Sequence, residues 1–406
     1  MPEVTVSTFA AATHALKQRD LRQALYDEGA VVMDRVLVNL HGDEHKARRN
    51  VESKVFRRNF FRYYETEVFP ATLQETLAPF LDAGHMDLVD FGYRVMVNLT
   101  VDFTGIDRPN KSAQETEALV AMLRLFGRTA TLAHYKDDRE QIRREAVAAL
   151  DEFDRRFVTP SAERRRALIA KVDAGEADEG TLPRDILTVL LRSEHEIDLP
   201  KDVLVREMAF FALAGAHTSI HTLSHAMHEM FSWAAAHPED WPRFETDTAF
   251  LQRAVHESIR LHPSSPVAVR RALCPMRLQE DAVEEGDQVV IDLQSANRDT
   301  AAFGGDAARF DPHREIPSGL ASYGLSFGLG MHACLGLNLA AGVLPKSGAH
   351  EIEPQTQERH LGTITLIAKA LLDHGARPDP KDPPRKDDST ARDLWAVYPV
   401  RFGVAG

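Results

Sequence analysis

The chain of 406 residues contains only two cysteines, Cys274 and Cys334, and its formal net charge is -13. Two cysteines cannot build a disulfide framework, and they fit a reducing compartment. The negative charge argues against broad binding to nucleic acid or anionic membranes. The N-terminus lacks the basic and apolar segments of a signal peptide, and no apolar run approaches the roughly 18 residues of a membrane span. These absences predict a cytoplasmic protein without a membrane anchor.

Helical periodicity dominates the remaining sequence. Hydrophobic residues make up 44% and charged residues 27%, which is ordinary for a globular protein with a sizeable core. Residues 7 to about 270 predict mostly helices, for example over 116–133 and 139–157, with a break at Thr159-Pro160. Residues 268–293 predict short strands, with a turn at 285–287 between strands at 276–279 and 288–293. A helix over 363–373 and a strand over 398–402 follow.

The most informative stretch reads Phe-Gly-Leu-Gly-Met-His-Ala-Cys-Leu-Gly and ends at Gly336. Its three glycines let the backbone carrying Cys334 approach a flat metal cofactor closely and direct amides at the sulfur. Residues 337–340 predict the start of a helix, whose N-terminus favours a thiolate. A buried free cysteine in a glycine-rich turn is the alternative interpretation.

This loop resembles, position by position, the haem-ligand loop of the cytochrome P450 family. The resemblance implies that Cys334 is the axial thiolate ligand of the iron in haem b (iron protoporphyrin IX). It also implies that Phe327, Gly328 and Gly336 contact this cofactor. The fold that it implies is mainly α (α+β), with a large helical domain and a small β-rich lobe.

The resemblance covers roughly residues 10–340, and we expect a single domain over residues 1–406. Both ends depart from the family pattern. The N-terminal region is atypically short, and an unusual polar insertion at about 341–362 interrupts the helix that the family has after the ligand loop. The departures concern the outer strands of the sheet and the roof of the substrate channel.

A second motif, Glu257-Ser-Ile-Arg260, supports the resemblance. Residues three apart share one face of a helix, so the two side chains can form a charge-assisted pair. In the family this pair is structural, because it locks the segment that supports the ligand loop. The third partner is expected to be Arg309 or Arg314.

The two propionates of a haem must be neutralised when the cofactor is buried. The resemblance assigns this role to His45, Arg49, Arg270 and His332, with Arg271 as the alternative to Arg270. For each of these residues alone, a solvated surface charge is the competing interpretation.

Residues 208–216 are apolar on every face and predict a helix buried in the middle of the molecule. Its end, Ala214-Gly215-Ala-His217-Thr218, resembles the oxygen-activation pattern Ala-Gly-x-acid-Thr of the family. There Ala214 lies at the haem, Gly215 gives dioxygen room, and the acid and Thr218 deliver protons. His217 stands where the acid is expected, and it can relay protons, contact substrate or only fill space.

Four histidines, His217, His221, His225 and His228, recur on this helix at spacings of three or four residues. A spacing of four suits two ligands of one metal ion, and His217 with His221 is the obvious pair. A polar ridge packed against neighbouring helices is the favoured interpretation, because no cysteine or close carboxylate completes a ligand set.

The resemblance implies a haem-thiolate monooxygenase that inserts one oxygen atom of O2 into a C–H bond of a lipophilic small molecule. Electrons would come from an external ferredoxin and ferredoxin reductase, since no flavin or iron–sulfur motif is present. The alternatives are a peroxide-driven peroxygenase, a non-hydroxylating P450 oxidase that couples or rearranges its substrate, and a non-enzymatic haem-binding protein. His217 is a hint toward the first two alternatives, and the presence of Thr218 argues against them.

Overall fold

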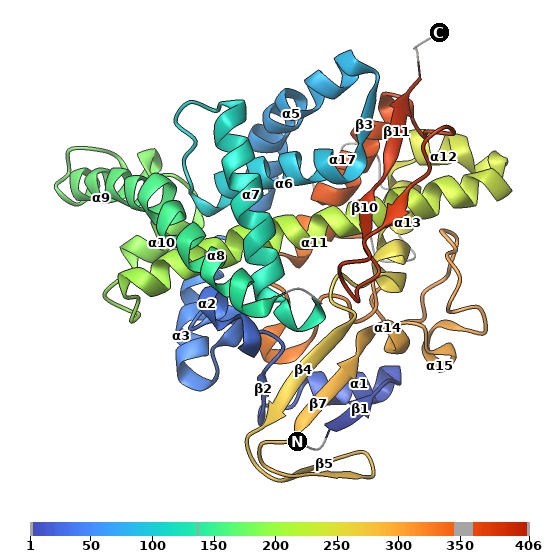
Figure 1. Ribbon diagram of the computed structural model, residues 1–406, viewed down its shortest axis with the longest axis horizontal. Helices are drawn as coiled ribbons and strands as arrows, with labels where there is room; N and C mark the ends of the chain where they lie inside the picture. The colour runs from blue at the N-terminus through green and yellow to red at the C-terminus, as the bar shows by residue number, and fades with distance from the viewer. Residues whose placement is uncertain (1–2, 136–137, 345–359, 404–406) are drawn as a thin grey trace.

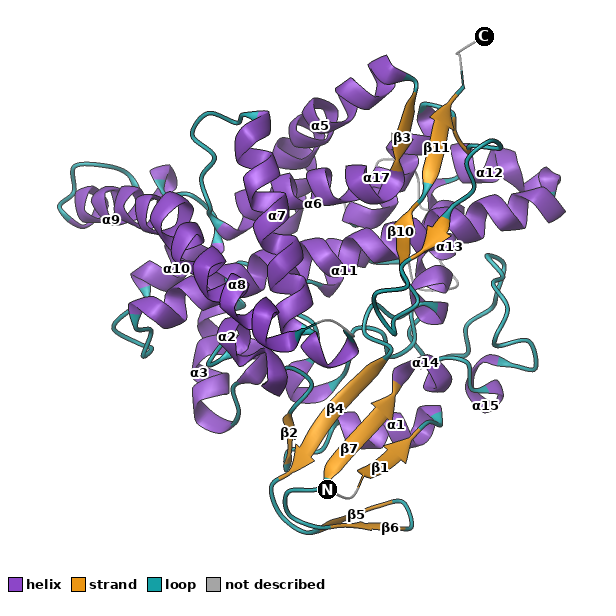
Figure 2. Cartoon of the chain, viewed as in Figure 1, coloured by secondary structure: helices purple, strands orange, loops and turns teal. Residues whose placement is uncertain are grey.

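The structure, a computed structural model, describes residues 3–135, 138–344 and 360–403. Helices hold 58% of the residues and the sheets are small, which confirms the predicted mainly α fold (Figures 1 and 2). The helices are α1 Phe9–Leu16, α2 Ala30–Met33, α3 Gly42–Glu52, α4 Arg58–Tyr63, α5 Phe69–Ala83, α6 Leu88–Thr104, α7 Ala113–Ala130, α8 Arg139–Phe153, α9 Thr159–Asp173, α10 Ile186–Arg192, α11 Lys201–Ala236, α12 Trp241–Thr246, α13 Thr248–Leu261, α14 Leu293–Ala296, α15 Thr300–Phe303, α16 Leu337–Ala341 and α17 Thr363–Asp373. The strands are β1 Glu3–Val6, β2 Leu21–Gln23, β3 His85–Asp87, β4 Val267–Ala272, β5 Met276–Leu278, β6 Asp281–Val283, β7 Gln288–Asp292, β8 Ala376–Pro378, β9 Arg385–Lys386, β10 Trp395–Val397 and β11 Pro399–Phe402.

Helix α11 forms the axis of the molecule and crosses its middle in Figure 1. Its 36 residues pack against α6, α7 and α13, as the apolar stretch at 208–216 predicts. By length and composition α11 is apolar enough to cross a membrane, but 72% of its most apolar window is buried inside the molecule. Burial on nearly all faces is what a core helix of a large helical fold requires.

Short polar side chains fix where several helices begin. Ser112 accepts a hydrogen bond from the amide of Glu115, and the Glu115 carboxylate accepts one from the amide of Ser112, which closes a capping box at the start of α7. Asp247 caps α13 in the same manner by accepting hydrogen bonds from two amides of the first turn. These caps satisfy amides that the helix itself leaves unpaired.

The main sheet has the strand order β1-β7-β4-β2, and it lies at the bottom of Figure 1. β1 is parallel to β7, whereas β4 is antiparallel to both β7 and β2. Buried residues alternate along β4 and β7, so one face of the sheet is covered. The short N-terminal region therefore still supplies α1 and the two outer strands.

The predicted strands are partly confirmed. The turn before β7 and the strand at the C-terminal end, β11, are present, and β11 pairs with β3 and β8. The segment predicted at 276–279 is β5, and it pairs in a separate hairpin with β6, a strand that was not predicted. β6 is short and bounded by polar residues, so its alternation was too brief to be recognised.

The predicted helix break at Thr159-Pro160 is wrong. α8 passes through a π-helical turn at Asp154–Val158 directly into α9, and Pro160 lies in the first turn of α9. In a continuous helix, proline has no N–H to donate to a carbonyl of the preceding turn, and its ring needs extra room there. The extra residue of the π turn accommodates the ring without ending the helix.

The structure describes the two ends of the predicted insertion at about 341–362. Residues 345–359 lie outside the described residues. α16 ends at Ala341 and α17 begins at Thr363. Between them Gly342 and Gly362 lie back to back, with φ values of 71° and 80°. The amide of Val343 donates to the carbonyl of His360 at 2.8 Å, so the chain leaves and returns at the same point.

Replacing Gly362 by alanine tests this close contact. A Cβ at this position would lie 2.3 Å from the backbone nitrogen of Gly342, and the left-handed φ adds strain. We expect a loss of more than about 3 kcal/mol of unfolding free energy in urea denaturation. The control is Gly286→Ala, whose φ of 87° is similar but whose Cβ would meet open space, and we expect it to cost about 1 kcal/mol. Equal losses would contradict the contact.

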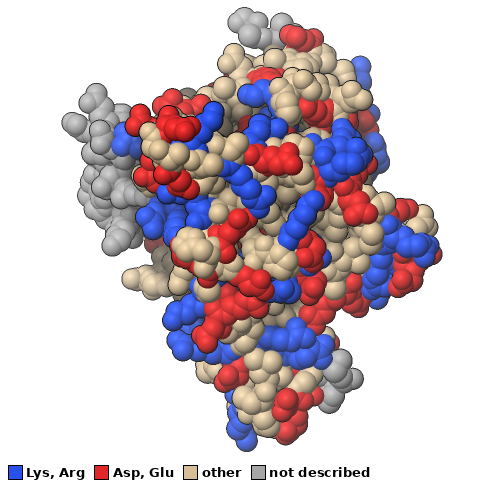
Figure 3. All heavy atoms as spheres, turned by 90° about the vertical axis from the view of Figure 1, so that its left-hand side faces the viewer, with Lys and Arg blue, Asp and Glu red and all other residues tan. Residues whose placement is uncertain are grey.

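The face of the molecule on the left of Figure 1 carries charges of both signs. Figure 3 shows Lys and Arg side chains interspersed with Asp and Glu side chains over this face, without a broad basic area. Interspersed charges favour solubility and do not provide the basic stripe that a nucleic acid backbone requires.

Candidate functional site

Cys334 is held in a tight loop that is anchored at both ends. Its amide donates to the carbonyl of Phe327 at 2.9 Å, and the amide of Gly328 donates to the carbonyl of Leu325 at 2.8 Å. Gly330 has a φ of 70°, and a Cβ there would lie 2.7 Å from the carbonyl oxygen of Leu16 at the end of α1. The glycines thus allow the loop to pack directly against α1.

The sulfur of Cys334 lies at the start of α16. The amides of Gly336 and Leu337 donate to it, and a Cβ on Gly336 would be 4.0 Å away. Burial raises the pKa of the Cys334 thiol, whereas these amides and the charge of Arg49 lower it. Metal coordination would remove the thiol proton outright, because a thiolate is the form that binds iron.

A cavity separates the Cys334 loop from α11. It is lined by Cys334, Phe327, Gly328, His332 and Arg270 on one side and by Thr218 on α11. Apolar walls are formed by residues such as Leu25, Val38, Val267, Ala268 and Ile364. The accessible surface of the Cys334 side chain faces this cavity, and protein atoms surround the rest of the side chain. The cavity therefore joins six of the predicted site residues.

Two predicted propionate ligands, His45 on α3 and His332, lie together with ring centroids 4.6 Å apart. The Nε2 atom of each ring is buried without a hydrogen-bond partner among the described residues. Burial lowers the pKa of His45 to about 4 and that of His332 to about 3. Buried polar atoms without partners are uncommon, so they indicate a site for a polar ligand. The haem propionates that the family pattern implies fit this position.

The predicted arginines complete this cluster. Arg49 donates to the carbonyl of Ala333 at 2.5 Å, beside Cys334. Arg270 lines the cavity and donates to Gln23, and burial lowers its pKa to about 10. Arg271 points elsewhere, because alternate residues of β4 face opposite sides of the sheet, and it donates to the carbonyl of Gly286 at 3.0 Å. The geometry therefore favours Arg270 over Arg271 as a propionate ligand.

The adjacent arginines provide a matched test of haem retention. We expect Arg270→Gln to accelerate the transfer of haem to an excess of apomyoglobin by about tenfold, because one charge-assisted contact is lost. Arg271→Gln should leave the transfer rate within about twofold of the native rate. If the two variants lose haem equally fast, Arg270 does not contact the cofactor.

Three of the predicted site residues, Ala214, Gly215 and Thr218, lie on α11 and have different surroundings. The hydroxyl of Thr218 lies in the cavity and donates to the carbonyl of Ala214 at 2.7 Å. Ala214 is half-buried one turn before it. Gly215 packs against α6, where a Cβ would lie 2.8 Å from Thr100 Cγ2. The glycine is thus required for the close approach of α6 and α11, in addition to any role toward dioxygen.

His217 is buried and faces away from the cavity lining, toward α6 and the C-terminal segment. Its Nε2 lies 3.3 Å from Arg392 and its Nδ1 lies 3.4 Å from the hydroxyl of Tyr93. Because arginine only donates, Nε2 accepts, and the ring proton lies on Nδ1. Burial lowers the pKa of His217 to about 3, and the charge of Arg392 contributes. His217 is therefore neutral between pH 5 and 8, and any relay would pass through the neutral ring.

The other histidines of α11 bond to neighbouring segments. His225 Nε2 lies 2.7 Å from the carbonyl of Asp393, and His228 Nδ1 lies 3.1 Å from the hydroxyl of Tyr398. Both nitrogens of His221 are buried without partners among the described residues. His217 already uses both ring nitrogens, so a metal shared by His217 and His221 is not favoured. This arrangement matches the predicted polar ridge.

One further group of His225, His262 and Asp393 places its ligand atoms within 4.8 Å of one another. The two imidazole rings are stacked 4.3 Å apart at an interplanar angle of 5°. The Nε2 atom of His225 is already bonded to the carbonyl of Asp393. Lys386 already pairs with Asp393 at 2.6 Å.

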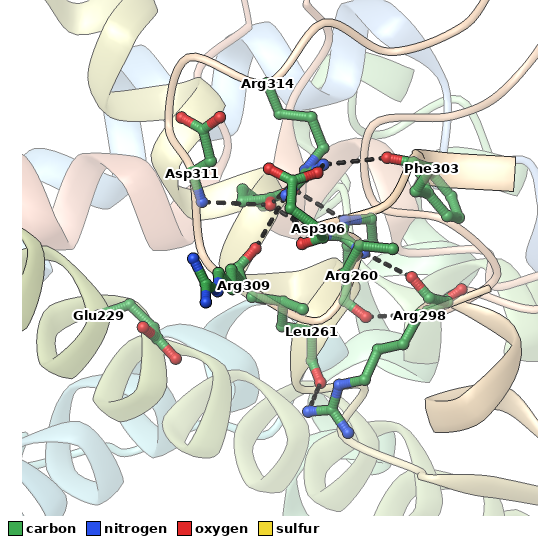
Figure 4. Close-up of polar contacts among 12 residues, drawn as sticks. Glu229, Arg260, Leu261, Arg298, Phe303, Asp306, Arg309, Asp311 and Arg314 are labelled. Carbon is green, nitrogen blue, oxygen red and sulfur yellow. Dashed lines mark hydrogen bonds and ion pairs between the residues drawn. The ribbon is translucent and has the colours of Figure 1, made fainter. Parts of the chain in front are cut away.

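The Glu257 motif forms a buried ion triad with Arg260 and Arg314, whose surroundings are drawn in Figure 4. Arg260 donates to Glu257 through two nitrogens at 2.7 and 2.8 Å, and Arg314 donates to the same carboxylate at 2.8 Å. Arg260 also donates to the carbonyls of Asn297 and Ala307. Of the two predicted third partners, the structure selects Arg314, and Arg309 contributes only its carbonyl oxygen.

The family model of cytochrome P450 matches residues 246–343, a range that contains both the Glu257 triad motif and the Cys334 loop. By this match, and by the relatives and solved structures that follow, the chain is similar to the cytochrome P450 family. It is 26% identical over 344 residues to steroid C26-monooxygenase of Mycobacterium tuberculosis (strain CDC 1551 / Oshkosh), a match covering 82% of each chain. It is 27% identical over 323 residues to pulcherriminic acid synthase of Bacillus subtilis (strain 168), covering 75% of this chain and 70% of that protein.

Among solved structures, CalO2 shares this fold with a TM-score of 0.74 and 21% identity, over 99% of this chain and 91% of that one. A P450 of this family is a haem-thiolate oxidoreductase that uses O2 and a redox partner.

Three residues near α11 were not predicted from the sequence: Tyr26, Tyr93 and Arg392. They come from segments without a motif, and only the fold brings them to α11.

Proposed function

We propose that the protein inserts one oxygen atom of O2 into a C–H bond of a lipophilic small molecule. One observation carries this proposal: Cys334 and the Thr218 hydroxyl line the same cavity, whose other walls are largely apolar. Haem, when bound, supplies the iron that activates oxygen and is held by thiolate. An apolar cavity with few polar groups suits a lipophilic substrate.

The haem is proposed to be haem b, with Cys334 as its iron ligand and with Phe327, Gly328, Gly336 and Ala214 around it. Covalent attachment of the c type needs a Cys-x-x-Cys-His motif, which this sequence does not contain. His45, Arg49, Arg270 and His332 would bind the two propionates, because they gather partly buried donors and positive charge at one place.

The electrons are proposed to come from a ferredoxin and its reductase. An iron–sulfur cluster within the chain would need four ligands, mostly cysteines, and the chain has two cysteines. We further propose that the protein is cytoplasmic and that residues 1–406 act as one domain. The low cysteine content supports the first of these proposals.

The Thr218 hydroxyl is proposed to direct protons into the cavity. It donates to the Ala214 carbonyl, and rotation about its C–O bond redirects the proton toward a ligand. The carbonyl of Thr218 accepts from Thr222 and Ser264 at 2.9 and 3.1 Å, so the backbone there is held in place. Gly215 and His217 position this segment of α11.

Thr218→Val tests this role. We expect the yield of product per electron consumed to fall about tenfold or more, because the hydroxyl is removed while the side-chain volume is kept. The measurement compares the consumption of NADH with product formation in a ferredoxin system. The control is Thr246→Val on α12, an exposed threonine outside the cavity whose hydroxyl likewise donates to the carbonyl four residues before it, and it should retain most of the yield. An unchanged yield in Thr218→Val would contradict the proposed role.

A peroxide-driven peroxygenase is the second candidate, and the neutral, buried His217 favours it because a titrating acid is missing. The test is product formation from one substrate with O2, ferredoxin, reductase and NADH, compared with hydrogen peroxide alone. We expect the reductase system to give most of the product. A reaction supported only by peroxide would select the peroxygenase, and no product from either would favour a haem-binding protein.

A further inference from the structure

Arg392 is a buried cation that none of the roles above uses. It lies in the segment between β9 and β10 and is 8% exposed. Among the described residues, its guanidinium donates one hydrogen bond, to the neutral ring of His217, and no carboxylate contacts it. A guanidinium stays charged at physiological pH, and an unpaired buried charge is strongly unfavourable. Within the described part of the chain, no residue therefore supplies a counter-charge at this position.

The groups around Arg392 are hydroxyls rather than acids. Those close enough to interact electrostatically with its charge belong to Tyr26, Tyr93 and Tyr135. Arg124 stacks on the ring of Tyr93, 3.8 Å from its centroid, and its own charge is paired with Asp90 at 3.8 Å. Hydroxyl donors beside a guanidinium form a site for an oxyanion, since each can donate to it.

This group of residues adjoins the cavity that contains Cys334. Tyr26 lines the cavity, and its hydroxyl interacts electrostatically with Arg392, with Arg270 and with Cys334. Thr218, the residue after His217, lines the same cavity. A ligand in the cavity can therefore reach toward Arg392 past Tyr26.

The residue at position 217 explains why the charge is unpaired. The family pattern has an acid there, and its carboxylate would lie beside Arg392 and neutralise it. Histidine keeps the hydrogen bond but supplies no negative charge, because its ring is neutral in this environment. With histidine at position 217, the negative charge that neutralises Arg392 has to come from a bound ligand.

We propose that Arg392, assisted by Tyr26, binds the carboxylate of the substrate, which is an apolar carboxylic acid. The inference rests on the proposed monooxygenase function and narrows its substrate class. The guanidinium fork matches a carboxylate in two parallel hydrogen bonds, and the apolar walls accept the remainder of the molecule. Arg392 is a binding residue in this account.

The test uses acids paired with neutral amides of the same shape: dodecanoic acid with dodecanamide, and 4-butylbenzoic acid with 4-butylbenzamide. Each compound is titrated into the ferric holoprotein, and binding is followed by the shift of the haem Soret band. We expect at least one acid to bind about tenfold or more tightly than its amide, as one charge-assisted pair would give. Equal binding of acid and amide in both pairs, or no shift from any compound, would overturn the proposal.

Two variant pairs locate the effect. Arg392→Gln should remove the preference for the acid, whereas Arg385→Gln, which loses an exposed arginine of the same segment, should keep it. His217→Asp should also remove the preference, because the new carboxylate pairs with Arg392. His217→Asn, whose side chain has the size of aspartate but no charge, should retain the preference for the acid. A preference that survives in both Arg392→Gln and His217→Asp would place the anion elsewhere.

The carbon monoxide spectrum of every reduced protein separates this inference from the proposed function. If the spectrum shows thiolate ligation but the acids bind no better than the amides, only the inference about Arg392 fails. If thiolate ligation is missing from the native protein, the haem-thiolate assignment fails first. The spectrum also shows whether Arg392→Gln has folded with its haem in place.

Discussion

Glu257→Gln is expected to prevent the accumulation of haem-containing protein at 37 °C. The substitution removes the charge that neutralises Arg260 and Arg314, and both the Glu257 and Arg260 side chains are less than 5% exposed. Breaking one partner of a buried ion pair costs about 3–5 kcal/mol, which is a large fraction of the stability of an ordinary domain. The measurement is the yield of folded, haem-containing protein at 18 °C and 37 °C, followed by urea denaturation of any protein recovered.

The control for this prediction is Asp306→Asn. Asp306 also pairs with Arg314, at 2.7 Å, but its side chain is 55% exposed. Exposed ion pairs contribute little, so we expect the yield and the denaturation midpoint to stay close to the native values. Normal yield and stability in Glu257→Gln would show that the triad is not needed to support the Cys334 loop.

Cys334→Ala is expected to reduce product formation more than about 100-fold, because the iron loses the ligand that sets its reactivity. The variant should fold, since the loop is held by backbone hydrogen bonds of Phe327 and Leu325 and not by the sulfur. The measurement is product formation in the ferredoxin system together with circular dichroism as a check of folding.

Cys274→Ala is the matched control for this second prediction. Cys274 is the other cysteine of the chain and lies just after β4, outside the residues that line the cavity. It should leave product formation within about twofold of the native level. Loss of activity in Cys274→Ala, with activity retained in Cys334→Ala, would contradict the account, because it would show that Cys274 binds the iron.

Local motifs predicted the parts of the site that are contiguous in the chain. The Cys334 loop, the end of the helix at Thr218 and the Glu257 pair each depend on spacings within one turn or one helix. Arg314 was one of two expected partners, because the sequence places Arg309 and Arg314 equally well. Only the fold shows which guanidinium reaches the carboxylate.

Contacts between distant segments could not be predicted in this way. Arg392 reaches His217 across 175 residues, and no pattern within either segment indicates that they meet. The direction in which His217 faces follows from the packing of α11 against α6, which a single helix does not determine. The depressed pKa of His217 follows from the same burial.

Two errors in the predicted elements have a common cause. Pro160 predicts a break because proline usually ends a helix, but the π turn before α9 accommodates its ring within a continuous helix. The strand β6 was not predicted, although it lies between β5 and β7 and pairs with β5 in a hairpin. In both cases a short irregular segment overrides a rule that holds for longer elements.

The central claim is that the sulfur of Cys334 binds the iron of a haem in this cavity. The most direct test is the absorption spectrum of the purified native protein after reduction and saturation with carbon monoxide. We predict a Soret maximum at the long wavelength that is characteristic of thiolate ligation. A colourless protein, or a maximum at the position typical of imidazole ligation, would contradict the claim.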